Sequence, residues 1–273
     1  MRRQAILEAL RRRIATGQAV LAAGCSAGIV ARSAEEGGAD LIVVYSTGRS
    51  RLMGLPTWRF GDSNQGTLEM SSEILNVVST TPVIGGIEAN DPTRRDLGRL
   101  LDRFEAAGFS GVINFPTLTN MPDQRRRAEM VGYGFGREVD AIRLARGRGL
   151  LTMAYVASAE DAAAMAAGGA DVIVTHSGPT TGGRVGYSDD RSVEAVCAYA
   201  QSLIDAAVAE NPDVIPLLHG GRLATPDDVR KALPLTTAVG FVGASSIERI
   251  PVERAVRNTV RAFRNLSTGS EQT

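Results

Sequence analysis

Short runs of apolar, β-branched residues recur along the chain, and each run ends in glycine or polar residues. The runs are continuous rather than alternating, which is typical of strands buried on both faces of a parallel sheet. Segments with apolar residues at helical spacing lie between them. We predict eight strands, at Ala19–Ala23, Leu41–Tyr45, Pro82–Ile87, Gly111–Phe115, Leu150–Val156, Asp171–Thr175, Val214–Leu218 and Val239–Val242.

Helices are predicted before and between these strands, and several of their starts carry clear signals. Asp91-Pro92, Ser158 and Thr225-Pro226 are typical of helix N-caps. The helix that precedes the first strand would plug the floor of a barrel. The predicted helices are Arg2–Ala15, Thr67–Val78, Thr93–Ala107, Glu160–Ala167, Val193–Val208, Pro226–Leu233 and Val252–Phe263.

Strand and helix alternate along the whole chain, which indicates an α/β fold of the closed (β/α)8 TIM-barrel type with an extra N-terminal helix. An open doubly wound sheet is the alternative. We expect residues 1–273 to form a single domain, with a disordered tail at Ser267–Thr273. The segment Pro116–Gly136 is too long for a plain strand-to-helix loop and is a candidate lid or subunit contact.

Charge and cysteine content narrow the function classes. Thirty basic residues balance 30 acidic ones, so no net charge attracts nucleic acid or an anionic membrane. Lys231 is the only lysine and falls in a predicted surface helix, which argues against a Schiff-base mechanism. Cys25 and Cys197 cannot form a disulfide framework. The chain shows no secretory signal and no apolar run of membrane-spanning length, so we expect a cytoplasmic protein.

In a parallel barrel, residues at the carboxyl ends of the strands share one pocket. The only two histidines, His176 and His219, follow the sixth and seventh predicted strands, and imidazole suits proton transfer near neutral pH. Glu88 and Asn114 follow the third and fourth strands and are further catalytic candidates. Glu88, His176 and His219 also form a candidate ligand set for Mg, Mn or Zn. The alternative is that the histidines bind loop carbonyls and hold the rim together.

Glycine-rich and polar segments supply candidate binding residues. Glycines after the seventh and eighth strands are typical of the barrel anion site, although tight turns also require them. A short helix near Ile247–Arg249 would point its N-terminus at that anion. Arg49 and Arg51 follow the second strand, where they would clamp a carboxylate. The anion-site candidates are Gly220, Gly221, Gly243, Ala244 and Ser245; the substrate-site candidates are Ser46, Arg49, Asp62, Tyr155, Thr180, Thr181 and Gly182.

Several motifs together resemble the phosphoenolpyruvate hydrolase-like TIM-barrel family. They are Gly37-Gly38-Ala39-Asp40-Leu41-Ile42-Val43, Gly61-Asp62-Ser63-Asn64, Gly111-Val112-Ile113-Asn114-Phe115-Pro116-Thr117, Thr180-Thr181-Gly182-Gly183, His219-Gly220-Gly221 and Gly240-Phe241-Val242-Gly243-Ala244-Ser245-Ser246-Ile247-Glu248-Arg249. The resemblance covers nearly the whole chain and implies distant kinship to the isocitrate lyase and phosphoenolpyruvate mutase superfamily. Members of that superfamily form or consume an enolpyruvate-like intermediate, usually with Mg²⁺ held by acidic residues. This chain lacks the Lys-Lys-Cys-Gly-His loop of isocitrate lyase and carries Glu88 and Asp91 in place of a close acidic pair.

Residues and resemblance together predict a lyase or hydrolase acting on a small oxyanionic substrate, a 2-oxo acid or an enol phosphate. The reaction would pass through an enolate-like intermediate with histidine acid–base catalysis. One alternative is an FMN-dependent oxidoreductase or oxygenase, with the cofactor phosphate on the glycines after the last two strands. Another is a sensor domain that binds a small ligand without turning it over. A homo-oligomer is expected by analogy with the superfamily.

Overall fold

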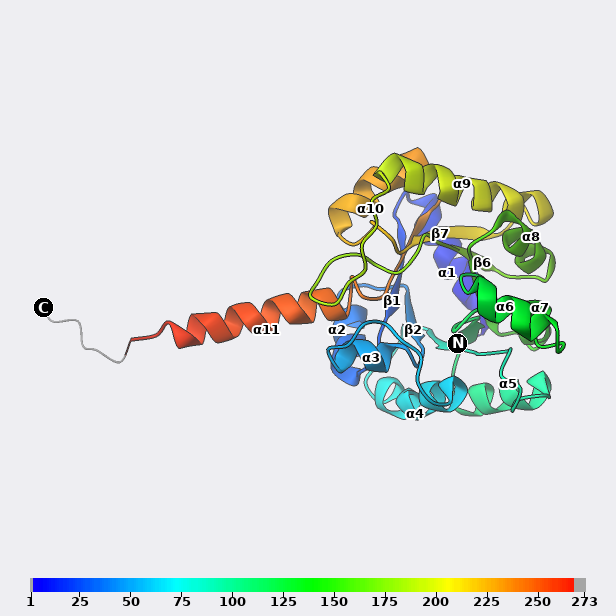
Figure 1. Cartoon of the computed structure of the whole chain (residues 1–273), viewed down its shortest axis with the longest axis horizontal. Coiled ribbons are helices and arrows are strands. Elements are labelled where there is room, and N and C mark those ends of the chain that lie inside the picture. Colours follow the sequence, from blue (N-terminus) through cyan, green and yellow to red (C-terminus); the bar gives the residue numbers. More distant parts are fainter. Residues whose placement is uncertain (1, 268–273) are drawn as a thin grey trace, which may run out of the picture.

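Eight parallel strands close into a barrel in the computed structural model, which describes residues 2–267 (Figure 1). Successive strands pair in chain order, and the last strand pairs with the first. The predicted TIM barrel is therefore confirmed, and the open-sheet alternative is wrong. The strands are β1 (Val20–Gly24), β2 (Leu41–Val44), β3 (Val83–Gly86), β4 (Gly111–Ile113), β5 (Leu151–Val156), β6 (Val172–His176), β7 (Ile215–His219) and β8 (Gly240–Gly243).

The barrel interior is closed at its floor by the first helix, α1 (Arg3–Ala15). Ile6, Leu7 and Leu10 are buried and belong to the same apolar cluster as the inward-facing strand residues. Arg3 fastens the helix to the barrel because its guanidinium binds the Asp171 carboxylate at 2.6 Å and 2.8 Å. The predicted floor plug is confirmed, and it leaves the opposite end of the barrel open for a site.

The outer layer contains helices that the apolar pattern did not reveal. α6 is rich in arginine and has no buried residue, so it carries no apolar periodicity to detect. α2 and α7 each begin at a glycine, and α3 is short. The unpredicted helices are α2 (Gly28–Glu36), α3 (Gly48–Leu52), α6 (Pro122–Glu129) and α7 (Gly136–Gly147); the others are α4 (Ser63–Leu75), α5 (Leu97–Ala106), α8 (Ala159–Ala167), α9 (Val193–Glu210), α10 (Pro226–Ala232) and α11 (Arg249–Arg264), with a 3₁₀ turn at Leu233–Leu235.

Two of the three predicted helix caps are confirmed. The Ser158 hydroxyl accepts the N–H of Asp161, and Thr225 forms a full capping box with Asp228. Asp91 is not a cap, because its carboxylate accepts the Thr93 N–H in a local turn and the helix starts later with Asp96 as its N-cap. The short helix expected near Ile247–Arg249 is also wrong, since a turn there leads directly into α11.

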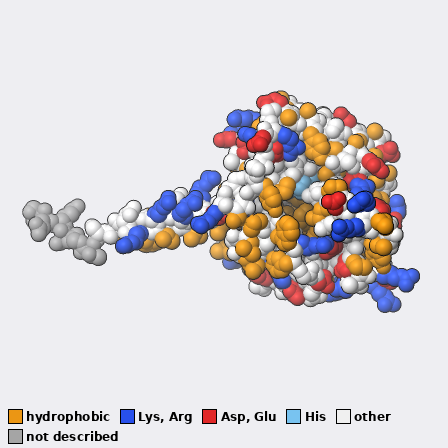
Figure 2. Space-filling view, viewed as in Figure 1, with side chains coloured by type: hydrophobic (Ala, Val, Ile, Leu, Met, Phe, Trp, Pro, Cys, Tyr) orange, Lys and Arg blue, Asp and Glu red, His pale blue; other side chains and the backbone are white. Residues whose placement is uncertain are grey.

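α11 extends away from the barrel instead of packing on it (Figure 1). Val256, Val260 and Phe263 are 57%, 60% and 70% exposed, and they lie on one side of the helix. Figure 2 shows arginine side chains along the other side.

No helix of the described residues is long and apolar enough to cross a membrane. Apart from Ser267, the predicted tail lies outside the residues that the structure describes.

Candidate active site

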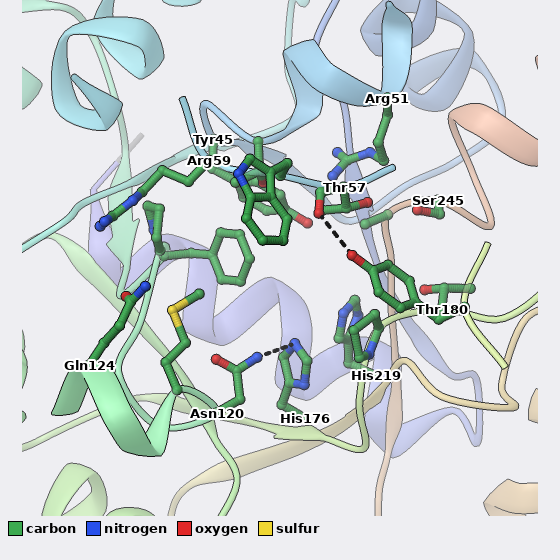
Figure 3. A pocket seen from close by; sticks show the side chains of 18 residues that line it. Tyr45, Arg51, Thr57, Arg59, Asn120, Gln124, His176, Thr180, His219 and Ser245 are labelled. Atoms are coloured by element: carbon green, nitrogen blue, oxygen red, sulfur yellow. Dashed lines mark hydrogen bonds between the residues drawn. The ribbon is translucent and has the colours of Figure 1, made fainter. Parts of the chain in front are cut away.

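A cavity of about 390 Å³ opens at the carboxyl ends of the strands. Figure 2 shows histidine at the bottom of a hollow on this face. Arg51 and Ser245 lie on one side of the cavity, and Arg59 and Gln124 lie on the opposite side (Figure 3). Its lining comprises Tyr45, Thr47, Arg51, Thr57, Trp58, Arg59, Phe115, Pro116, Asn120, Met121, Gln124, His176, Pro179, Thr180, Tyr187, His219, Ala244 and Ser245.

The two histidines face the cavity as a pair with complementary hydrogen-bonding roles. Their ring centroids are 5.1 Å apart. The Nδ1 atom of His219 lies 2.7 Å from the carbonyl oxygen of Val242, so Nδ1 carries the hydrogen and Nε2 is left with a lone pair. The Nδ1 atom of His176 accepts the N–H of Gly178 at 3.2 Å, so its Nε2 carries the hydrogen. One ring therefore offers an acceptor and the other a donor.

Burial keeps both imidazoles uncharged. Burial, with a smaller contribution from the neighbouring His219, lowers the pKa of His176 to about 3. Burial also lowers the pKa of His219 to about 4, although its bond to Val242 acts in the opposite direction. Neutral rings at physiological pH differ from the proton carriers with a pKa near neutrality that the sequence suggested.

These shifts predict an acid-sensitive fold. A histidine whose folded pKa is depressed gives full stability above its unfolded pKa of 6.5, and that stability is lost as the pH falls toward 3 or 4. We expect acidification from about pH 7.5 to 5.5 to cost the wild type about 2–3 kcal/mol more unfolding free energy than a His176→Asn, His219→Asn variant. Urea unfolding at the two pH values measures this difference.

The comparison with the double variant matters because another buried group titrates in the same range. Burial raises the pKa of Glu138 to about 7, which stabilises the fold as the pH falls. That contribution is common to both proteins and cancels in the difference. Equal acid losses in the two proteins would contradict the assignment of neutral histidines.

Arg51 reaches the cavity from α3 and is held there by a buried ion pair. Its Nη2 and Nε atoms lie 2.8 Å and 3.0 Å from a carboxylate oxygen of Glu248, at the root of α11. Both side chains are at most 1% exposed. Glu248 also accepts the backbone N–H of Ser26 at 2.7 Å. Beside Arg51, the buried Thr47 hydroxyl has no hydrogen-bond partner among the described residues. The Arg51 guanidinium and the Thr47 hydroxyl together suit the binding of a ligand carboxylate.

Aromatic rings continue from the histidines across the cavity floor. Tyr155 lies beneath them, with ring centroids 4.9 Å from His219 and 5.2 Å from Phe115. Phe115 in turn lies 4.6 Å from Tyr45. Tyr155 is fully buried and does not line the cavity. It supports the floor, whereas the sequence suggested a contact with substrate.

The predicted metal ligand set is wrong. Among the residues that the structure describes, no three His, Cys, Asp or Glu side chains come close enough to hold a metal ion. Glu88 forms an ion pair with Arg59 and does not line the cavity. Mg²⁺ prefers carboxylate and other hard oxygen ligands, and the cavity lining offers no carboxylate. The side chains present therefore do not fit a magnesium centre.

Asn114 serves the barrel wall instead of the cavity. Its carboxamide oxygen accepts the Tyr155 N–H at 2.6 Å, and its nitrogen donates to the Tyr155 carbonyl and to Glu138. Glu138 is fully buried and also accepts the Thr117 hydroxyl. This network ties β4 to β5 and to α7. Because every polar atom of the Asn114 carboxamide is engaged, it has none free to orient a substrate.

The glycines after β7 bind neighbouring loops. The N–H of Gly221 donates to the Gly178 carbonyl at 2.8 Å, and its carbonyl accepts the N–H of Thr181. Gly220 and Gly221 have φ angles of +78° and +56°, so they are the tight-turn glycines of the alternative interpretation. Gly243 packs against Ile247. Of the anion-site candidates, only Ala244 and Ser245 line the cavity. The FMN alternative finds no support in this geometry.

Three other candidates border a separate cavity of about 200 Å³ beside the mouth. It is lined by Ser46, Arg49 and Asp62, and Arg49 forms an ion pair with Glu69 at 2.8 Å. Asp62 caps α4 by accepting the N–H of Gln65. Of the two arginines considered after the second strand, Arg51 lines the main cavity and Arg49 does not.

Only part of the loop after β6 lines the cavity. Thr180 lines it, but Thr181 pairs with the β7 loop. The carbonyl of Gly182 accepts from Arg249 at 3.0 Å, next to Glu248 at the root of α11. This loop therefore joins the cavity rim to the projecting helix.

Sequence reasoning missed several lining residues on long loops. Trp58 and Arg59 come from the segment between α3 and α4, and Asn120 and Met121 come from the segment expected as a lid or subunit contact. The amide nitrogen of Asn120 lies 3.4 Å from Nε2 of His176, and a rotation of the amide by about 180° turns its oxygen toward the Nε2–H group. Trp58, the only tryptophan, is 69% exposed. Its residue type was the one available signal in the sequence, because tryptophan is enriched at binding surfaces.

Polar groups that converge at the carboxyl ends of eight parallel strands place this chain among the (β/α)8 barrels with a pocket of enzyme type. Within that class, the chain belongs to the phosphoenolpyruvate hydrolase-like family, whose model matches residues 5–266. The resemblance recognised in the sequence motifs is confirmed.

Two curated relatives are similar over most of this chain but are much longer. The ToMV susceptible protein tm-1(GCR26) of Solanum lycopersicum is 42% identical over 275 residues, which cover 97% of this chain and 36% of the tomato protein. The putative transcriptional regulatory protein y4pA of Sinorhizobium fredii is 34% identical, over 91% of this chain and 42% of its own length. The chain thus spans well under half of each relative.

Solved structures with the same fold include two enzymes crystallised with oxalate. A phosphonopyruvate hydrolase complex with oxalate and Mg²⁺ has a TM-score of 0.64 and 19% identity, covering 95% of this chain and 87% of the other. An oxaloacetate acetylhydrolase complex with oxalate has a TM-score of 0.60 and 17% identity, covering 97% and 89%. At these identities the similarity establishes the fold alone.

Proposed function

We propose that this protein is a lyase or hydrolase that acts on a 2-oxo acid by forming its enolate. The observation that carries the proposal is the pair of neutral, oppositely polarised imidazoles beside Arg51. The fold is shared with a phosphonopyruvate hydrolase and an oxaloacetate acetylhydrolase, whose named substrates are 2-oxo acids, and this supports the choice of substrate class.

The arrangement assigns a role to each side chain. The substrate carboxylate would bind Arg51 and the hydroxyls of Thr47 and Ser245, which lie together in the lining. The Nε2–H group of His176 would donate to the 2-oxo oxygen, where negative charge develops. The Nε2 lone pair of His219 would accept a proton from C3, leaving the electron pair to form the enolate double bond.

Hydrogen exchange tests enolate formation whichever bond of the substrate is finally broken. We expect the protein to speed deuterium incorporation from D₂O at C3 of at least one 2-oxo acid, followed by proton NMR. A panel of pyruvate, 2-oxobutanoate, 4-methyl-2-oxopentanoate and phenylpyruvate spans the side groups. Because the lining does not fit a metal centre, EDTA should leave the rate unchanged. Binding without exchange would favour the sensor alternative.

The exposed side of α11 supports a homo-oligomer. The amphipathic helix α11 extends from the barrel with valines and Phe263 exposed, and exposing this apolar side to water is unfavourable unless a partner buries it. Every copy of the chain carries the same apolar side on α11, and the zero net charge of the chain adds no long-range repulsion between copies. We therefore propose that a second copy of this chain covers this apolar side.

A pair of matched substitutions tests the role of α11. We expect Val260→Glu to shift the protein toward monomer, because each buried glutamate would lack a partner at the interface. Arg261→Gln changes the net charge by the same amount on the arginine side and should leave the mass unchanged. Light scattering after gel filtration gives the mass. A wild-type monomer would contradict the proposal.

A further inference from the structure

We infer that the cavity selects 2-oxo acids that carry a single negative charge and an uncharged apolar side group, aryl or branched alkyl, over phospho- or phosphono-substituted ones. The inference rests on the proposed function for its carboxylate-binding end. It deepens that function by naming the other half of the substrate, and three observations carry it.

The first observation is the surface that a bound side group would meet. Tyr45, Phe115, His219 and His176 line the cavity, and the Tyr155 ring lies 4.9 Å to 5.4 Å from the last three of them, centroid to centroid. Offset and edge-on ring contacts of this kind favour aryl and alkyl groups. Trp58, Met121, Pro116, Pro179 and Tyr187 extend the apolar lining above this floor.

The second observation is the balance of charge. Arg51 and Arg59 are the only charged residues in the lining, and each is already paired with a carboxylate, Glu248 and Glu88 respectively. Both histidines are held neutral. A phosphonate adds about two negative charges to the carboxylate at neutral pH, and burying them without counter-charges is strongly unfavourable. One carboxylate needs only the donors of Arg51 and nearby hydroxyls.

The third observation is the size and cover of the space. Its volume of about 390 Å³ lies in the range of pockets that bury most of an organic ligand. The hydroxyl of Tyr187 donates to the Thr57 carbonyl at 3.3 Å, so the β6 loop meets the loop that carries Trp58. Thr57 and Tyr187 both line the cavity, so this contact joins the two loops at its edge; Figure 3 marks it with a dashed line beside Thr57.

Calorimetric titration of the wild type with three probes tests the inference. We expect 4-methyl-2-oxopentanoate to bind at least about tenfold more tightly than pyruvate, because its extra methyl and methylene groups are buried. Phosphonopyruvate should bind more weakly than either. Quenching of the single tryptophan, Trp58, by the branched acid would place it in this cavity.

A matched pair of variants locates the selectivity. Met121→Glu puts a charge in the apolar lining and should weaken the branched acid at least about tenfold. Met130→Glu makes the same change at a residue that is 82% exposed and outside the lining, so its affinities should equal those of the wild type. Unchanged binding in Met121→Glu would overturn the inference.

The binding data separate this inference from the proposed function. If the branched acid is preferred but no 2-oxo acid exchanges its C3 hydrogen, the function fails and the inference stands. If exchange occurs but phosphonopyruvate binds as tightly as the branched acid, the inference alone is overturned. Failure of all three probes to bind also overturns it.

Discussion

Replacing Arg51 with methionine is expected to lower the free energy of unfolding by about 3–5 kcal/mol, the cost of leaving a buried charge without its partner. Glu248 is 0% exposed, so water cannot solvate its carboxylate once the guanidinium is gone. The remaining donor, Ser26, supplies one backbone N–H and one hydroxyl contact at 2.7 Å and 3.2 Å. Urea denaturation of the purified variant measures the loss.

Two further variants separate the buried charge from other causes. Arg51→Met combined with Glu248→Gln should recover most of the lost free energy, because glutamine still accepts from Ser26 but carries no charge. Arg230→Met removes an arginine from an ion pair with Asp227 that is 74% exposed on each side, and it should change stability by less than about 0.5 kcal/mol. A loss in Arg51→Met no larger than in Arg230→Met would show that the pair is not effectively buried.

The strand pattern predicted the barrel well because burial on both faces leaves a strong trace in sequence. β2 and β5 are buried at every position, so β2 appears as an uninterrupted apolar run and β5 as a run broken only by Thr152. Helices that pack loosely leave no such trace. α6 has no buried residue, and its sequence is therefore indistinguishable from a polar loop.

The candidate site was predictable only in part, because the sequence shows where strands end but not which way the side chains at those ends point. His176, His219 and Ser245 end strands or follow them directly, and all three line the cavity. Asn114 also follows a strand, yet its hydrogen bonds to Tyr155 and Glu138 hold it in the wall. Nothing in the residue order shows whether a polar side chain will bind a ligand or a neighbouring strand.

Ion pairing is a second property that the sequence conceals. Arg51 and Glu248 are far apart in the chain, and their contact depends on the closure of β8 against β1. The same is true of Glu88, whose pairing with Arg59 removes it from the predicted metal set. Charge neutrality of the pocket is therefore a property of the assembled barrel, which residue order alone does not reveal.

Replacing His219 with asparagine is expected to slow C3 hydrogen exchange by about 10²- to 10⁴-fold, the usual contribution of a positioned general base. Asparagine retains a donor for the Val242 carbonyl, which His219 Nδ1 approaches at 2.7 Å, but it removes the Nε2 lone pair. Affinity for the 2-oxo acid should stay within about threefold of the wild type, because the carboxylate is held by other side chains. Full exchange activity in this variant would refute the assignment of His219 as the base.

The pH profile of the wild type gives an independent check on that base. Burial lowers the pKa of His219 to about 4, so the lone pair stays available well below the ordinary imidazole pKa of 6.5. We therefore expect kcat/KM for exchange, which reports ionisations of the free enzyme, to remain level from about pH 8 to pH 5. A base in ordinary solvent would lose half of its activity at pH 6.5 and about tenfold for each unit below it. Such a fall would mean that water reaches His219 in the working enzyme, and it would remove the physical basis for a site that holds its imidazoles neutral.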